Sequence, residues 1–303
     1  MLTFGICTVD QYMRAARKGP LSGTTVSYGL LQIGENPTEE EVCRFEDITF
    51  VLRTSNGTRR TTFRRRMSDV DTTTLELLQH WYPRDAHLLV QDRAASDCLT
   101  SAEWAEELFR LFPRATLEAS DRLLYLLRIS LAGGKAYLIE PDGEPLQYLH
   151  PPFVIFLNYH NPYRYPLRSV IAALAKRSFG KLNLSQECGA YQVERICCVH
   201  PEAKALRKRD SRFQICMRSV FGRSPGIDVL RTMNILNRNY FPIERLVEGV
   251  NAAFQSLKPG GLWIVGRTLE NRTSHVTFFR RTEKKWEATA RIGNGSEIEE
   301  LIA

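Results

Sequence analysis

A short loop of small and acidic residues could hold a ligand against the protein backbone. The loop reads Asp92-Arg-Ala-Ala-Ser-Asp-Cys98 and follows an apolar run at 87–91. Small side chains let the backbone approach a bound molecule closely, and the N-terminus of a following helix favours an anionic group. Thr100-Ser-Ala-Glu103 has the spacing of a capping box, which predicts Thr100 as the N-cap of that helix.

Two further polar residues follow other apolar runs. Asp121 comes after the run at 115–119, and an acid there can accept hydrogen bonds from both hydroxyls of a ribose. Asn234 comes after the run at 227–233. In a doubly wound sheet, ligands bind outside the carboxyl ends of the strands beside the switch point. Each feature alone could equally be a cap or a turn, but their order along the chain predicts a shared ligand site.

Alternating strands and helices would bring these residues to one edge of a sheet. Apolar residues at 246, 250, 254 and 257 mark an amphipathic helix. The alternation predicts a parallel sheet with right-handed crossovers. Two final strands joined by a charged turn predict that the sheet ends in an antiparallel hairpin. We predict helices at 100–111, 123–131, 167–179 and 246–257, and strands at 48–52, 87–91, 115–119, 136–139, 192–199, 213–217, 227–233, 262–265, 275–280 and 286–291.

Several of these segments are similar to one known family. Lys258-Pro-Gly-Gly261 before an apolar strand resembles the turn before strand five of class I S-adenosylmethionine-dependent methyltransferases. The nearest likeness is to the chemotaxis-receptor (CheR-like) methyltransferases, and it covers roughly residues 84–281 without the middle segment. Ala95-Ser96 is similar to the Ala-Ser-Thr-Gly loop of that family. The other similar segments are Ala119-Ser120-Asp121, the pair Asp228 and Asn234 with its spacing, and Tyr240-Phe241.

The resemblance implies a fold and an activity. The fold would be α/β, Rossmann-like and doubly wound, with a seven-stranded, mostly parallel sheet and an antiparallel C-terminal hairpin. Residues 1–80 would form an N-terminal accessory region of unclear fold. Residues 81–303 would form the S-adenosylmethionine-binding domain, with an aromatic and proline-rich insert near 145–190. The implied activity is methyl transfer to a peptide, protein or small-molecule acceptor. The alternative is a catalytically weak or inactive binding or regulatory protein of the same fold.

The resemblance also implies the cofactor-binding residues. The glycine loop is degenerate, because Ala94 and Cys98 stand where glycines are expected and a Cβ there could narrow the pocket. Asp97 is expected to contact the methionine amino group, and Ser219 stands where an Asp or Asn usually contacts adenine. The implied set is Asp92, Ala94, Ala95, Ser96, Asp97, Asp121, Ser219, Val220 and Asn234.

The catalytic residues stay unassigned at this stage. Methyl transfer mainly requires that donor and acceptor be aligned, so no residue type is obligatory. Tyr159, His160 and Tyr163 could orient an acceptor or remove a proton, but such residues are also common in a core or at its rim.

The charge of the chain is compatible with an anionic partner. Lys and Arg number 41 against 34 Asp and Glu, a net charge of +7. The run Arg59–Arg66 holds five arginines and no acid, and 201–223 holds seven Lys or Arg against two acids. Each is either a solvated face or a docking surface for an acidic protein or peptide. A nucleic-acid partner is disfavoured, since aromatic residues other than Phe63 do not interleave with the cations, but it stays open.

Composition excludes several classes of protein. Hydrophobic residues at 43% and charged residues at 25% are typical of a globular chain. No apolar stretch is long enough to span a membrane, and the N-terminus lacks the pattern of a signal peptide. Seven scattered cysteines and six dispersed histidines predict neither a disulfide framework nor a metal site. We therefore expect a cytoplasmic, soluble protein whose oligomeric state the sequence leaves open.

Overall fold

The computed structural model describes residues 4–17, 19, 25–157, 166–179, 191–269 and 271–302. The chain divides into two units. Unit 1 comprises residues 1–61 and 123–201, and unit 2 comprises residues 62–122 and 202–303. The boundaries therefore fall at 61 and 62, not at 80 and 81 as expected from the sequence. The segment 123–201 separates the two parts of unit 2 in the sequence, and it is longer than the insert expected near 145–190. It joins the N-terminal segment in one unit.

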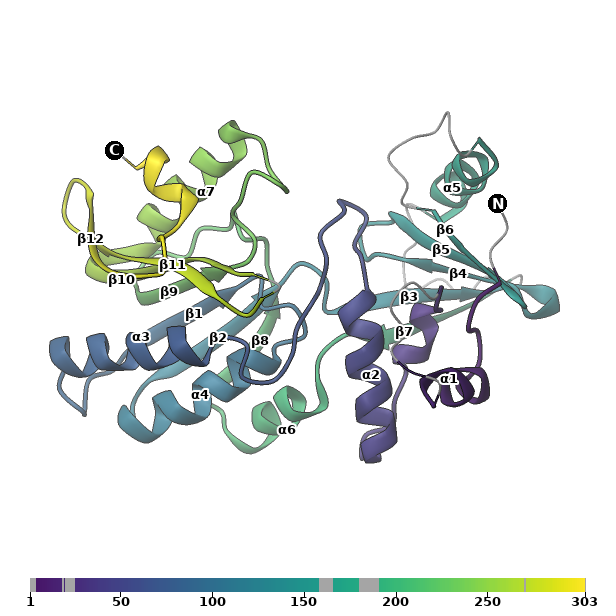
Figure 1. Ribbon diagram of the computed structural model, residues 1–303, viewed down its shortest axis with the longest axis horizontal. Helices are drawn as coiled ribbons and strands as arrows, with labels where there is room; N and C mark the ends of the chain where they lie inside the picture. Colours follow the sequence, from purple (N-terminus) through teal and green to yellow (C-terminus); the bar gives the residue numbers. More distant parts are fainter. Residues whose placement is uncertain are drawn as a thin grey trace. The chain divides into compact units, whose positions relative to one another are not determined.

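Unit 2 is built on a seven-stranded sheet in the order β12-β11-β10-β9-β1-β2-β8 (Figure 1). The strands from β10 to β8 pair in parallel, and β11 and β12 each pair antiparallel to the preceding strand. The order reverses between β1 and β9, which is the switch point of a doubly wound fold. The Rossmann-like sheet with an antiparallel finish is thereby confirmed. The strands are β1 (Leu89–Arg93), β2 (Thr116–Asp121), β8 (Phe213–Met217), β9 (Ile227–Met233), β10 (Leu257–Thr268), β11 (Ser274–Arg281) and β12 (Trp286–Ile292).

Helices cover both faces of this sheet. Figure 1 shows α3 (Ser68–Trp81) and α4 (Leu99–Leu111) on one face, and α7 (Ile243–Ser256) with the short helix η3 (Glu297–Leu301) on the other. The helix α6 (Pro201–Arg209) precedes β8. Because the central strands are covered twice, every residue of β9 is buried, as expected for a parallel strand between two helical layers.

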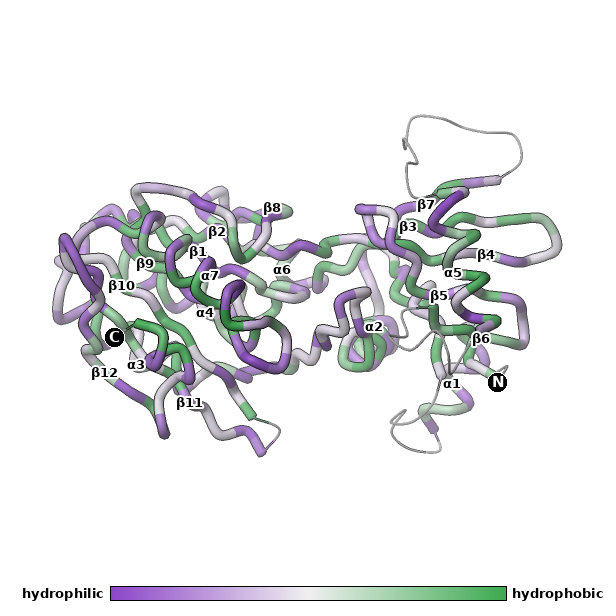
Figure 2. Tube along the Cα trace, turned by 90° about the horizontal axis from the view of Figure 1, so that it is seen from above, coloured by the Kyte–Doolittle hydropathy of each residue, from purple (hydrophilic) through white to green (hydrophobic). Residues whose placement is uncertain are grey.

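Unit 1 contains a five-stranded antiparallel sheet in the order β6-β5-β4-β3-β7. Its core joins residues of the sheet, such as Leu126 and Leu138, to Phe45 and Ile48 of a helix. Figure 2 shows hydrophobic stretches along these strands. The strands are β3 (Tyr125–Ser130), β4 (Ala136–Ile139), β5 (Pro145–His150), β6 (Phe153–Phe156) and β7 (Gln192–Cys197), and the helices are α1 (Val9–Ala16), η1 (Tyr28–Leu31), α2 (Glu39–Val51), η2 (Ala132–Gly134) and α5 (Pro166–Phe179).

Several local predictions were wrong. Residues 123–131 contain the strand β3 rather than a helix, because a short apolar run does not by itself distinguish the two. Residues 48–52 end the helix α2 rather than forming a strand, since a capping box at Thr38 and Glu41 starts a helix that continues to Val51. Strands at 136–139 and 192–197 exist, but they belong to the antiparallel sheet of unit 1.

Candidate functional site

The carboxyl ends of β1, β2, β8 and β9 lie side by side at one edge of the unit 2 sheet. Asp92 in β1 pairs with Ala119 of β2 on one side and with Arg231 of β9 on the other. Asp121 at the end of β2 pairs with Met217 at the end of β8. The loops that follow these four strands therefore emerge at one edge. The residues implied by the family resemblance lie in these loops, except for Asp92 within β1 and Asp121 at the end of β2.

The loop after β1 adopts a left-handed backbone at every second residue. The φ angles are 61° at Ala94, 57° at Ser96 and 66° at Cys98. Glycine adopts this conformation freely, whereas a side chain makes it costly by about 1–2 kcal/mol per residue. The backbone thus takes a shape suited to glycine although the sequence has none there. The Cys98 side chain is fully buried, so only Ala94 and Ser96 carry half-buried side chains at these positions.

Two hydrogen bonds fasten this loop to the end of β2. The backbone N–H of Ser96 donates to Oδ2 of Asp121 over 2.9 Å, and the N–H of Ala95 donates to the carbonyl of Ser120 over 2.9 Å. Asp121 is half-buried. The acid that the sequence singled out therefore lies within hydrogen-bond reach of the loop backbone.

The start of α4 differs from the sequence prediction. Cys98, not Thr100, is the N-cap, and Thr100 is buried inside the helix. Oδ1 of Asp97 accepts a hydrogen bond from the backbone N–H of Leu99 over 3.1 Å, and Asp97 is buried. Its carboxylate therefore binds an otherwise unpaired donor at the helix N-terminus.

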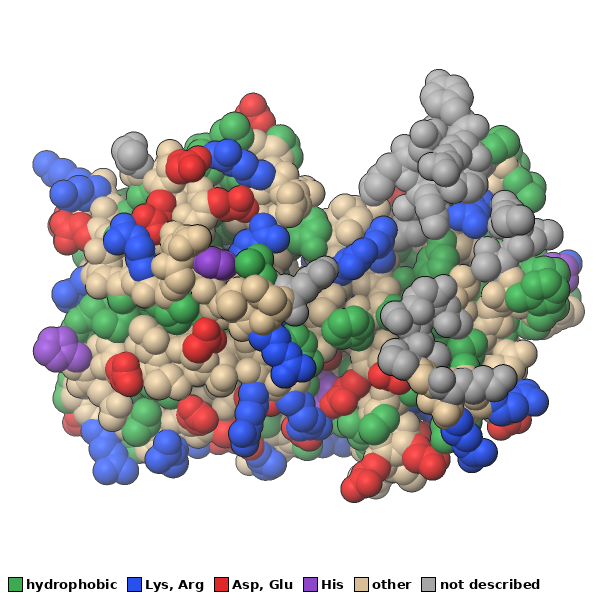
Figure 3. Space-filling model, in the orientation of Figure 1, with side chains coloured by type: hydrophobic (Ala, Val, Ile, Leu, Met, Phe, Trp, Pro, Cys, Tyr) green, Lys and Arg blue, Asp and Glu red, His purple; other side chains and the backbone are tan. Residues whose placement is uncertain are grey.

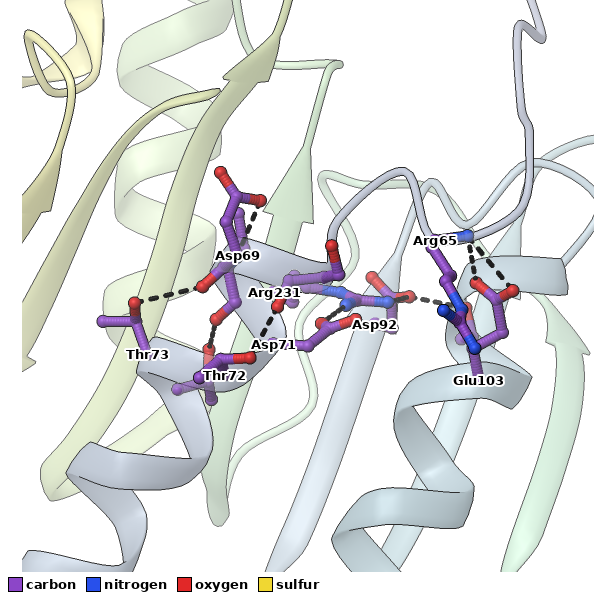
Figure 4. Close-up of polar contacts among 12 residues, drawn as sticks. Arg65, Asp69, Asp71, Thr72, Thr73, Asp92, Glu103 and Arg231 are labelled. Carbon is purple, nitrogen blue, oxygen red and sulfur yellow. Dashed lines mark hydrogen bonds and ion pairs between the residues drawn. The ribbon is translucent and has the colours of Figure 1, made fainter. Parts of the chain in front are cut away.

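Asp92 belongs to a buried ion-pair network that the sequence did not reveal. Figure 4 shows the guanidinium of Arg231 between the carboxylates of Asp71 and Asp92, and each N–O distance is 2.5 Å. The guanidinium also lies 4.2 Å from the ring centroid of Trp104, and Oγ of Ser101 donates to Asp92. The network connects α3, α4, β1 and β9 behind the loop. A basic residue inside the apolar strand 227–233 was the one signal of it in the sequence.

Burial acts against the negative charge of this network. It raises the pKa of Asp71 to about 7, although Arg231 acts in the opposite direction. The pKa of Arg231 itself is raised because the pairing with Asp92 and Asp71 outweighs its own burial. Burial and pairing thus act in opposite directions on Asp71 and on Arg231, with burial the larger effect on the acid and pairing the larger effect on the base.

The loop after β8 is held by a buried arginine. Ser219 is exposed and its Oγ accepts the N–H of Phe221 over 3.3 Å, while Val220 packs against the core on the α7 face. Arg93 of β1 is buried and donates to the carbonyl of Gly222 and to Oγ of Ser256. Burial lowers the pKa of Arg93 to about 10. Arg93 thereby fixes the loop that contains the expected adenine contact.

Asn234 joins the ends of β9 and β10. It has a left-handed backbone with φ 62°, its N–H donates to the carbonyl of Gly266, and its Oδ1 accepts the N–H of Thr268 over 2.7 Å. Its Nδ2 is buried and has no hydrogen-bond partner among the described residues. The side chain thus keeps one donor unused at the same edge of the sheet.

Three of the five arginines in the run Arg59–Arg66 have partners in the unit to which each of them belongs. Arg60 is buried and donates to the carbonyl of Leu123, Arg64 pairs with Glu202, and Arg66 donates to the carbonyl of Thr268. Arg60 is therefore inaccessible to a partner, whereas the Arg64–Glu202 pair lies on the surface.

Arginines of the second basic run, 201–223, also form ion pairs with acids of the same chain. Arg209 pairs with Glu106, and Arg212 pairs with Asp210. Figure 3 shows basic and acidic side chains interspersed on the face in view. Docking of an acidic partner on either run therefore stays a prediction.

Three further features were sought in the described part of the chain. None of its helices has the length and apolar character needed to cross a membrane. No three His, Cys, Asp or Glu side chains within it gather as a metal site would require. Tyr159, His160 and Tyr163 lie outside the described residues.

No family model and no curated protein matches the sequence. Several solved structures that are similar to the chain are methyltransferases. They include the citrinin polyketide synthase CMeT domain (11% identity, TM-score 0.37, 77% of this chain and 40% of that one) and an O-methyltransferase family protein from Burkholderia thailandensis (13%, 0.32, 86% and 53%). A third, the O-methyltransferase NcsB1 from neocarzinostatin biosynthesis, was solved with S-adenosylmethionine (11%, 0.27, 68% and 42%).

The chain spans only about half of each of these proteins or less. Their TM-scores are too low to carry an argument about function, which must rest on the chain's own residues. A nearest relation to the chemotaxis-receptor methyltransferases is not shown by these structures and stays a prediction.

Proposed function

We propose that unit 2 binds S-adenosylmethionine at the carboxyl edge of β1, β2, β8 and β9 and transfers its methyl group to an acceptor. One observation carries this proposal: the left-handed loop at 94–98 lies within hydrogen-bond reach of Asp121. A tightly turned loop of small residues beside a half-buried carboxylate suits a ligand with ribose hydroxyls, which the carboxylate would accept.

The residues present fit this cofactor in part. The loop has the backbone shape that glycines would give it, and its side chains at 94 and 96 are small. Asp121 is half-buried at the end of β2, which supports its proposed role as the acceptor of the ribose hydroxyls. Asp92 and Asp97 fit less well as direct contacts, because their carboxylates already serve Arg231 and the N-terminus of α4. We therefore propose that these two acids support the loop from behind.

The roles of the remaining residues follow from their positions. Asp121 would bind the ribose, and the small side chains of Ala94, Ala95 and Ser96 would let the cofactor approach the loop closely. Ser219 and Val220 would border the adenine, in a loop held by Arg93. Asn234 would border the cofactor from the end of β9, where its bonds to Gly266 and Thr268 hold it in place. When bound, S-adenosylmethionine supplies an activated methyl group, so alignment is the main task left to the protein.

One observation favours the alternative, a binding or regulatory protein of the same fold. Ala94 and Ser96 carry β-carbons at left-handed positions, where glycine would leave more room. Radioactive methyl transfer from labelled cofactor into a lysate of the source organism separates the two functions. Labelled product supports the enzyme, whereas cofactor binding without any product supports the binding protein.

Calorimetry with S-adenosylhomocysteine tests the proposed site. We expect binding to the wild type and a loss of at least tenfold in Asp121→Ala, because a charged hydrogen bond contributes about 1.5–3 kcal/mol. Asp121→Asn retains an acceptor for the N–H of Ser96 and should lose less. Asp85→Ala is the control, since Asp85 is exposed and precedes β1 at the opposite edge. Absence of binding to the wild type would refute the proposed function.

A further inference from the structure

A cavity of about 240 Å³ lies in unit 2 at the carboxyl ends of β9 and β10. Its wall includes the end of β10, the start of β11 and the segment leading into η3. The apolar part of the lining comes from Leu236 and Leu269, and the polar part from Arg267, His275, Ser296 and Glu297. None of these residues belongs to the proposed cofactor site.

Arg267 is the unusual member of this lining. It is half-buried, yet its guanidinium makes no hydrogen bond, ion pair or aromatic contact within the described chain. A guanidinium presents five donors in a planar fork that matches a carboxylate or phosphate. Other half-buried or buried arginines of unit 2, such as Arg93 and Arg231, have partners within the protein. The donors of Arg267 therefore remain free for a ligand in the cavity.

His275 adds a second donor on the same side. Arg267 and His275 are directly opposite each other in the β10–β11 pairing, so their side chains share one face of the sheet. Nδ1 of His275 accepts the backbone N–H of Asn294 over 2.9 Å, which leaves Nε2 as the protonated nitrogen of the neutral ring. Both residues are thus donors toward an anion.

Glu297 limits how much negative charge the cavity can take. Its Oε1 accepts the backbone N–H of Arg238 over 3.1 Å, which holds the carboxylate in the wall. Glu297 repels any negative charge on a ligand, so the single guanidinium of Arg267 can compensate one carboxylate but not two. Leu236 and Leu269 favour an apolar body in the rest of the space.

We propose that this cavity binds a small organic monocarboxylate, with its carboxylate on Arg267 and its apolar body against Leu236 and Leu269. Such binding requires no cofactor. The cavity and Asn234 both lie at the carboxyl end of β9. If the carboxylate bound here were the methyl acceptor, that role would rest on the proposed function.

Benzoate and its neutral analogue benzamide test this site in the full-length protein without cofactor. We expect ligand-observed NMR to show benzoate binding at least tenfold more tightly than benzamide. Arg267→Met should reduce benzoate binding to the benzamide level, and Lys285→Met, which removes an exposed cation elsewhere in unit 2, should leave it unchanged. Inorganic phosphate should bind more weakly than benzoate, because it has no apolar body.

Four results would overturn the site. They are undetectable benzoate binding, equal affinity for benzoate and benzamide, unchanged binding in a folded Arg267→Met, and an equal loss in Lys285→Met. If Arg267→Met fails to fold, the comparison of benzoate with benzamide on the wild type still tests whether the cavity prefers a carboxylate. S-adenosylhomocysteine binding is measured separately, so failure of this site is distinguishable from failure of the proposed cofactor site.

Discussion

The backbone N–H of Ser96 donates a hydrogen bond to the carboxylate of Asp121 over 2.9 Å. The two residues are 25 positions apart in the sequence: Ser96 lies in the loop after β1, and Asp121 is the last residue of β2. The bond fixes the acid at the end of β2 relative to the left-handed loop after β1. A ligand bound at Asp121 would therefore be positioned against that loop as well.

Glycine at two loop positions should improve the proposed site. In Ala94→Gly/Ser96→Gly the left-handed strain of about 1–2 kcal/mol per residue is relieved, against an entropic cost of about 0.5–1 kcal/mol for each glycine. We expect an unchanged or slightly higher free energy of unfolding and tighter S-adenosylhomocysteine binding by calorimetry. Ala95→Gly is the control, because Ala95 lacks a positive φ, and it should be destabilising. Weaker binding by the double variant would contradict a steric role for these side chains.

Arg93→Met should loosen the loop after β8. The carbonyl of Gly222 and Oγ of Ser256 would lose a buried donor, at a cost of about 1–3 kcal/mol in unfolding free energy. We expect faster trypsin cleavage after Arg218 or Arg223 under native conditions. Lys285→Met should leave that rate unchanged, and equal protection of the loop in Arg93→Met would argue against the anchoring role.

Arg231→Met should be strongly destabilising. It would leave Asp71 and Asp92 buried without their shared cation, and breaking a buried pair costs about 3–5 kcal/mol. Urea unfolding followed by circular dichroism measures this loss. Arg245→Met removes an exposed ion pair with Glu248 and should cost less than about 1 kcal/mol. Similar losses in the two variants would show that the network contributes no more than a surface pair.

Asp71 should make stability fall as the pH rises. Burial raises its pKa in the folded protein to about 7, whereas an unfolded Asp titrates near 3.9, so the folded state binds more protons between these values. Its stabilising contribution is full below about pH 4 and is lost as the pH rises through about 7. Between pH 6 and pH 8 we expect a loss of about 1 kcal/mol.

The comparison with Asp71→Asn isolates this effect. The variant cannot titrate at position 71, so its unfolding free energy should change less between pH 6 and pH 8 than that of the wild type. Parallel pH profiles of the two proteins would mean that Asp71 stays ionised in the folded state throughout this range.

The sequence predicted much of the parallel sheet in unit 2. The runs at 213–217 and 227–233 match β8 and β9 residue for residue, and the spacing of Leu246, Val250 and Phe254 located α7. These elements are legible because a strand buried on both faces is continuously apolar and a surface helix repeats every 3.6 residues. The same reasoning located Asp121 and Asn234 at the carboxyl ends of their strands, although Asp121 is still part of β2.

Only the tertiary structure decided how the remaining parts combine. The antiparallel sheet of unit 1 takes strands from 123–201 beside helices from the first 61 residues, a pairing that local periodicity does not encode. The ion pairs of Arg231 and the free donors of Arg267 are likewise invisible in the sequence. Both residues are arginines in strands. The folded protein brings two acids to Arg231, whereas Arg267 pairs with none of the described residues and is open to a ligand. Their neighbours in the chain do not reveal this difference.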